Sequence, residues 1–188
     1  MRAMERVKKG GYGYFSWEKK RRAAVAFALF LLPAGLFLIG YLQTGTRKNL
    51  FTLVAILGCL PACKSFVGFV MVLPRKSMER KVYERIQAHA GHLTMAYDLY
   101  VTTYEKNLQV DAAAVGGNTV VGYCSRRQEH REFIQNYLQD TLRRQGYPVT
   151  VRLLEELPPF LKKLDCMNGA PTDTREDEIR RILLAITI

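Results

Sequence analysis

The stretch AAVAFALFLLPAGLFLIGYL, residues 23–42, decides the architecture, because none of its twenty positions carries a charged side chain. At about 1.5 Å per residue, a helix of this length matches the hydrocarbon core of a bilayer, which is about 30 Å thick. A second apolar stretch, LFTLVAILGCLPACKSFVGFVMVL, covers residues 50–73 and follows the short polar segment QTGTRKN at 43–49. The sequence therefore predicts two antiparallel transmembrane helices joined by a tight turn, a hairpin over residues 23–74.

A cleaved signal peptide is the alternative interpretation of the first stretch. We disfavour it because the apolar run is long and no small-x-small cleavage site precedes the polar turn. Pro33 and Gly35 lie inside the run. Proline frees a carbonyl of the preceding turn, so we expect a kink near Leu32.

Charge is concentrated beside the apolar segments. The chain has 28 Lys and Arg against 17 Asp and Glu, a net charge of +11, of which residues 1–22 carry +6, residues 23–74 carry +3 and residues 75–188 carry +2. A DNA-binding domain would spread its basic residues over one face. We therefore expect a basic aromatic arm at 1–22, the hairpin, and a nearly neutral cytoplasmic domain at 75–188.

The basic residues also predict the orientation, since cytoplasmic loops are enriched in Lys and Arg. Eight lie in the arm and four soon after the second span, against two in the turn. Both termini are therefore expected in the cytoplasm, at the plasma (inner) membrane. The run Lys19, Lys20, Arg21 and Arg22 either adds binding to anionic lipid, about 1 kcal/mol per residue, or acts only as a topology determinant. Four aromatic residues before the first span could form an interfacial belt: Tyr12, Tyr14, Phe15 and Trp17.

Lys64 is unusual because it falls near the middle of the second predicted span. A lysine there costs about 2.5 to 3.5 kcal/mol on insertion scales, so a compensating feature is expected. Snorkelling, a hydrated kink after Pro61 or pairing with a freed carbonyl would each tolerate it, and a transport role is the alternative.

Small residues recur every four positions in the second span, at Ala55, Cys59 and Cys63. This spacing predicts a face on which another helix packs closely. Cys59 and Cys63 could instead hold a soft metal, but packing is the interpretation we favour, and we expect no metal site. A cytoplasmic location also predicts no structural disulfide.

The remainder of the chain predicts a small α+β domain in the order αβββαβαα. A helix capped by Ser77 precedes strands that form an antiparallel meander, and the first of these strands should turn one face inward through its odd-numbered residues from Leu93 to Val101. Capping boxes at Ser125 and Asp173 open later helices. The expected helices lie at 77–90, 125–145, 157–164 and from 173, and the strands at 93–103, 108–115, 119–124 and 149–154.

This order, over residues 75–188, resembles the core of the restriction-endonuclease-like PD-(D/E)xK nuclease fold, including its nuclease-related membrane-protein relatives. The resemblance implies that Asp111, in LQVDAAAV, is the aspartate of the second core strand and that Glu79 or Glu84 is the helical acid. The third strand should carry the (D/E)xK pair, but TVVGYCSR places Tyr123-Cys124-Ser125 there. One aspartate does not hold a divalent ion, so the resemblance implies a nuclease site that has been dismantled.

Three functions remain open. The first, which we favour, is a membrane-anchored binding or scaffold protein that presents a non-catalytic domain to a protein partner or a second copy of itself, with no cofactor and no nucleic acid. The second is a membrane-tethered, metal-dependent nuclease-like enzyme with a rearranged site, built from Asp111, Asp98 and Glu79 with Lys106. The third is a small transporter or channel component that uses Lys64.

Overall fold

The computed structural model describes residues 7–45, 50–103, 107–125, 130–169 and 175–187. The chain forms two compact units: the hairpin unit, Phe15–Lys76, and the α+β unit, which combines Met1–Tyr14 with Ser77–Ile188. The sequence pattern predicted a single arm over residues 1–22, whereas the structure divides that stretch between the units at residue 14.

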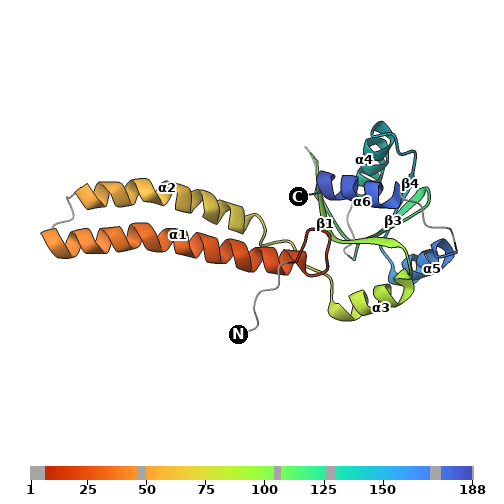
Figure 1. Cartoon of the computed structure of the whole chain (residues 1–188), viewed down its shortest axis with the longest axis horizontal. Helices are drawn as coiled ribbons and strands as arrows, with labels where there is room; N and C mark the ends of the chain where they lie inside the picture. The colour runs from red at the N-terminus through yellow and green to blue at the C-terminus, as the bar shows by residue number, and fades with distance from the viewer. Residues whose placement is uncertain (1–6, 46–49, 104–106, 126–129, 170–174, 188) are drawn as a thin grey trace. The chain divides into compact units, whose positions relative to one another are not determined.

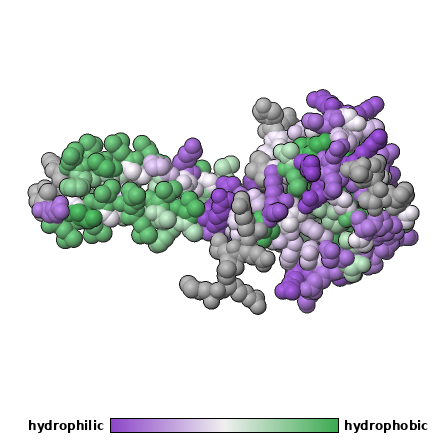
Figure 2. All heavy atoms as spheres, in the orientation of Figure 1, coloured by the Kyte–Doolittle hydropathy of each residue, from purple (hydrophilic) through white to green (hydrophobic). Residues whose placement is uncertain are grey.

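The hairpin unit contains α1, Tyr14–Thr44, and α2, Leu50–Val70, and each helix continues through an internal proline (Figure 1). Both are long and apolar enough to cross a membrane by length and composition. The structure exposes most of their large apolar side chains, such as Phe27 at 69% and Leu42 at 78%. Figure 2 shows the resulting hydrophobic surface over the two helices. This surface is unlike that of a helix buried in a protein core.

Small residues line the contact between α1 and α2. On α1, Ala26, Pro33 and Gly40 are buried at intervals of seven residues, and on α2 the buried pair Ala55 and Ala62 has the same spacing. A seven-residue repeat keeps one face of a helix toward its partner when two helices pack at a shallow angle. The small side chains let the backbones approach closely.

Of the three small residues predicted to form a packing face on α2, the structure buries Ala55. Cys59 is half-buried and Cys63 is exposed. A step of four residues exceeds the helical turn of 3.6, so a four-residue series rotates away from the contact. Gly58 lies nearer to it, since a Cβ built there would be 3.4 Å from the Cβ of Pro33.

The α+β unit follows the predicted order of elements. Its helices are α3, Arg80–Ala90, α4, Arg131–Arg144, α5, Leu157–Met167, and α6, Arg175–Ile186. Its strands are β1, Thr94–Thr102, β2, Asn107–Gly116, β3, Thr119–Tyr123, and β4, Thr150–Leu154. The sheet order is β1-β2-β3-β4, with β1, β2 and β3 antiparallel as predicted and β4 parallel to β3.

Two helices cover each face of this sheet (Figure 1). Helices α4 and α6 contribute apolar residues such as Ile134 and Leu183 to one core, and α3 and α5 contribute Ile86 and Phe160 to the other. Nine of the ten residues of β2 are therefore buried, because the central strand has no solvent-facing side. A three-layer arrangement results.

Two predicted helix caps are wrong. Helix α3 begins at Arg80, after an N-cap at Glu79, while the hydroxyl of Ser77 donates a hydrogen bond to Oδ2 of Asp98 at 2.6 Å. Helix α4 begins at Arg131, well after Ser125. The other predicted cap, Asp173, lies outside the described residues.

The alternation predicted for the first strand changes side at Asp98. This residue has φ 52°, in the left-handed region that Asp and Asn tolerate better than most side chains. Leu93, Met95 and Tyr97 consequently pack toward α3 and α5, whereas Leu99 and Val101 pack toward α4 and α6. A single reversed residue thus moves the second half of the apolar series to the opposite core.

The N-terminal segment packs on the edge of β1 at this point. The backbone N–H of Tyr97 donates to the carbonyl of Gly10 at 2.9 Å. The ring of Tyr12 stacks on Tyr83 with centroids 4.1 Å apart, and its hydroxyl donates to the carbonyl of Met78 at 3.2 Å. Tyr12 is therefore part of the α+β unit and not of the interfacial aromatic belt that we predicted.

We expect Tyr12→Ala to lower the free energy of unfolding of the α+β unit by about 2 kcal/mol. The change removes a ring stack and a hydrogen bond, each about 0.5 to 1.5 kcal/mol. Urea unfolding of the full chain in detergent, followed by circular dichroism, measures it. Tyr137→Ala on α4 is the control, and an equal effect of the two changes would contradict this role for the segment.

Candidate functional site

Asp111 is held in place by two hydrogen-bond donors. Its Oδ1 accepts from Nε2 of Gln109 and its Oδ2 from the backbone N–H of Ser125, both at 2.7 Å. The side chain is buried, with 2% of its surface exposed. Each carboxylate oxygen of Asp111 thus already accepts a hydrogen bond from the protein. This arrangement is typical of an aspartate that stabilises the fold.

Asp98 lies opposite Asp111 in the register of β1 and β2, between the pairs Tyr97↔Ala112 and Leu99↔Val110. It is also buried, at 3% exposure, and accepts the hydrogen bond from Ser77. Burial raises the pKa of the Tyr12 phenol, and the negative charge of Asp98 raises it further. The two aspartates are neighbours by strand pairing, but each is engaged with its own partners.

The other predicted acids do not complete a site. Glu79 is exposed at the N-cap of α3, and Oε1 of Glu84 pairs with Nε of Arg80 at 2.9 Å. Lys106 lies outside the described residues. Within the ranges that the structure describes, no three His, Cys, Asp or Glu side chains are grouped so that they could hold a metal ion.

The cysteine beside the aspartate is also unsuited to catalysis. Cys124 is buried at 1% exposure, and burial, followed by the charge of Asp111, raises the pKa of its thiol to about 12. The reactive form of a cysteine is the thiolate, so this side chain is a poor nucleophile near neutral pH. Cys124 packs in the core formed by α4, α6 and the sheet, and this packing explains why a cysteine lies at this position.

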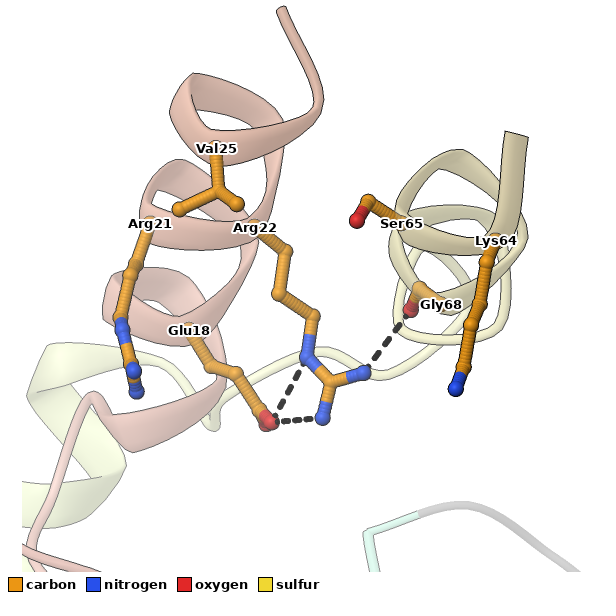
Figure 3. Close-up of a pocket in the computed structure, with 7 residues that line it drawn as sticks. All are labelled: Glu18, Arg21, Arg22, Val25, Lys64, Ser65 and Gly68. Atoms are coloured by element: carbon orange, nitrogen blue, oxygen red, sulfur yellow. Dashed lines mark hydrogen bonds and ion pairs between the residues drawn. The ribbon is translucent and has the colours of Figure 1, made fainter. Parts of the chain in front are cut away.

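A polar pocket in the hairpin unit brings together Lys64 and two residues of the basic run at 19–22 (Figure 3). It measures about 430 Å³. Its lining residues come from both helices and are Glu18, Arg21, Arg22, Val25, Lys64, Ser65 and Gly68. Three of these residues, Arg21, Arg22 and Lys64, were predicted individually from the sequence, but the pocket that they line was not.

Arg22 joins the two helices inside this pocket. Its Nε and Nη2 donate to Oε1 of Glu18 at 3.0 and 2.6 Å, and its Nη1 donates to the carbonyl of Gly68 at 3.1 Å. The carboxylate of Glu18 is almost entirely shielded, with 8% of its side chain exposed. One guanidinium therefore neutralises a buried acid on α1 and binds the backbone of α2.

Lys64 lies in the same pocket. Figure 3 shows its side chain extending past Gly68 toward the level of the Glu18 carboxylate and the two arginine side chains. Lys64 is exposed and six residues from the end of α2 at Val70. It lies inside the apolar helix α2, where it shares the pocket with the charged residues of α1.

Arg21 completes the positive side of the pocket. Its guanidinium carbon lies 5.5 Å from the centroid of the Trp17 ring, a cation–π contact that orients the side chain. Of the run Lys19, Lys20, Arg21 and Arg22, the two arginines line the pocket, while Lys20 is exposed elsewhere on α1. The sequence contained a signal for the position of Arg22, because Glu18 and Arg22 are four residues apart and can form an ion pair on one face of a helix.

Comparison of the chain with protein-family models, with curated proteins and with solved structures finds no match. The fold and the site define the chain as a helical hairpin of membrane-spanning length with a three-layer α+β unit.

Proposed function

We propose that this chain is a membrane-anchored binding or scaffold protein. The hairpin unit inserts into the plasma (inner) membrane with both termini in the cytoplasm, where the α+β unit binds a protein partner or a second copy of the chain without catalysing a reaction. The observation that carries this proposal is the apolar surface of α1 and α2.

That surface is too large for a helix pair in water. All but two of the exposed large apolar side chains in the described part of the chain lie between Val25 and Leu73. Contiguous exposed patches of this kind mark membrane or protein contacts. Two helices of membrane-spanning length favour lipid as the cover.

The polar pocket supports the orientation. Arg21, Arg22 and Lys64 lie together, so basic residues of both helices share one end of the hairpin unit. That end carries the connections to the rest of the chain, and cytoplasmic ends are enriched in Lys and Arg. Both termini would therefore stay inside the cell.

The α+β unit supports binding better than catalysis. Both oxygens of Asp111 accept hydrogen bonds from the protein, which opposes the nuclease alternative. Lys64 shares its pocket with Glu18, Arg21 and Arg22, so its charge has a setting that does not require the transport role of the third alternative. Phe133 and Tyr137 on α4 are exposed large side chains of the type enriched at protein interfaces.

Fractionation of cells that express the full chain tests the anchor. We expect the protein to remain with membranes after an alkaline carbonate wash, because lipid covers both helices. Reporters fused at Met1 and at Ile188 should both be protected from protease added outside the cell. Release by the wash, or an accessible reporter at either end, would contradict the proposed anchor or its orientation.

Incubation of the purified full chain with magnesium or manganese and with DNA or RNA tests the non-catalytic assignment. We expect both substrates to stay intact, since the described residues offer no three-ligand site. Cleavage that disappears when the metal is chelated would instead favour the nuclease alternative.

A further inference from the structure

We propose that the polar pocket of the hairpin unit binds the phosphate group of an acidic membrane lipid. The inference rests on the proposed membrane anchor and adds a defined ligand site to it. The proposed site consists of the seven residues of α1 and α2 that line this pocket.

The charge of the pocket favours an anion. Three cations, Arg21, Arg22 and Lys64, line the pocket together with a single carboxylate, that of Glu18. Arg22 and Glu18 neutralise each other through two hydrogen bonds. In the part of the chain that the structure describes, Arg21 and Lys64 form no ion pair with an acidic side chain, so two positive charges remain available to a ligand.

The ion pair also prepares the site. Because Arg22 donates to both Glu18 and the carbonyl of Gly68, it holds α1 and α2 at a fixed separation, with Lys64 among the residues that line the pocket. The pocket is therefore formed before a ligand arrives, which lowers the entropy lost on binding. The cation–π contact with Trp17 likewise holds the side chain of Arg21 in one orientation before a ligand binds.

The shape and polarity of the pocket fit the junction between a lipid head group and its chains. A volume of about 430 Å³ is far larger than the roughly 30 Å³ that one water occupies, so a phosphate with its glycerol link has room. Ser65 supplies a hydroxyl donor. Val25 supplies an apolar wall at the end of the pocket away from the Glu18 carboxylate (Figure 3).

Phosphate is the anion that these side chains suit. Lysine binds phosphate as a point charge and arginine as a planar fork of donors. At the cytoplasmic surface of a membrane, phosphate is carried at high density by acidic lipids. A soluble phosphate compound presents the same group, so the experiment must distinguish the two sources.

Native mass spectrometry of the full chain, released from nanodiscs, measures the lipid that stays bound. The nanodiscs contain phosphatidylcholine alone or with phosphatidic acid as a minor component. We expect phosphatidic acid to be retained in preference, and Lys64→Gln to weaken its binding about fivefold, the factor that follows from about 1 kcal/mol per basic residue. Lys64→Arg keeps the charge and should keep the binding.

Lys20→Gln is the matched control, because it removes one charge from the same basic run at an exposed position that does not line the pocket. Equal weakening by Lys20→Gln and Lys64→Gln would mean general attraction to a charged surface and would overturn the site. So would equal retention of the two lipids. In a second arm, inorganic phosphate replaces the acidic lipid at constant ionic strength, and the thermal stability of the chain is measured. Stabilisation by inorganic phosphate that depends on Lys64, without Lys64-dependent binding of phosphatidic acid, would overturn the proposal that the phosphate belongs to a lipid.

The result also separates this inference from the proposed function. A chain that leaves the membrane fraction contradicts the anchor itself. A chain that stays in the membrane, but whose lipid preference is unchanged by Lys64→Gln, contradicts the phosphate site alone.

Discussion

Asp111→Ala is expected to lower the free energy of unfolding of the α+β unit by about 3 kcal/mol. The change removes the acceptor for Nε2 of Gln109 and for the N–H of Ser125 at a position with 2% exposure. Hydrogen bonds to a charged group contribute about 1.5 to 3 kcal/mol each, and a buried donor left without an acceptor is costly. Urea unfolding of the full chain in detergent measures the loss.

Asp111→Asn sharpens this prediction. The side chain keeps its shape but offers one oxygen and one NH₂ group, and both of its neighbours are donors. The Asn oxygen can still accept from the N–H of Ser125, and its NH₂ group can bond to Gln109 if that amide rotates to present its oxygen, so we expect a loss smaller than that of the alanine change. Asp140→Ala, at an exposed position on α4, is the control and should change stability by less than about 0.5 kcal/mol. Unchanged stability in both Asp111 variants would return this residue to the candidates for catalysis.

The elements of the α+β unit were predictable because each has a strong local pattern. Helix α5 extends to Met167 where the prediction ended at 164, and the strands agree to within one or two residues at most of their ends. Three-stranded antiparallel pairing follows from short connections between alternating segments. The parallel pairing of β4 with β3 involves a distant segment, so no local pattern specified it.

Three of the errors in the α+β unit involve its two buried aspartates. Ser77 and Ser125 were expected to cap helices, but the hydroxyl of Ser77 binds Asp98 and the N–H of Ser125 binds Asp111. Asp98 also reverses the side on which β1 places its residues. Capping rules and strand periodicity describe local preferences, and here tertiary hydrogen bonds to buried carboxylates are stronger.

The pocket could not be assembled from the sequence for a different reason. Glu18 and Lys64 lie on different helices. The relative position of two antiparallel helices along their axes depends on how their small residues pack. A change of one helical turn in that position would place Lys64 against apolar residues. The anomaly of a charged residue in an apolar stretch was visible in the sequence, and its explanation required the paired helix.

Arg22→Gln is expected to destabilise the hairpin unit by about 2 kcal/mol even in the absence of any lipid ligand. The change removes the hydrogen bonds to Glu18 and to the carbonyl of Gly68, and it leaves a carboxylate with 8% side-chain exposure without its cation. Breaking a fully buried pair in this way costs about 3 to 5 kcal/mol, and the 40% exposure of the Arg22 side chain reduces the figure. Thermal denaturation of the full chain in detergent micelles measures it, with Lys20→Gln as the control.

The double variant Glu18→Gln/Arg22→Gln identifies the source of that loss. If the penalty comes from an uncompensated buried charge, removing the charge should restore part of the stability, because two amides can hydrogen-bond to each other without an ionic partner. A double variant that is less stable than Arg22→Gln alone would show that Glu18 contributes to the hairpin independently of Arg22. Lys64→Gln should leave this denaturation unchanged, since Lys64 is exposed and forms no ion pair with an acidic side chain in the described ranges. Stability and phosphate binding are thus assigned to different cations of one pocket.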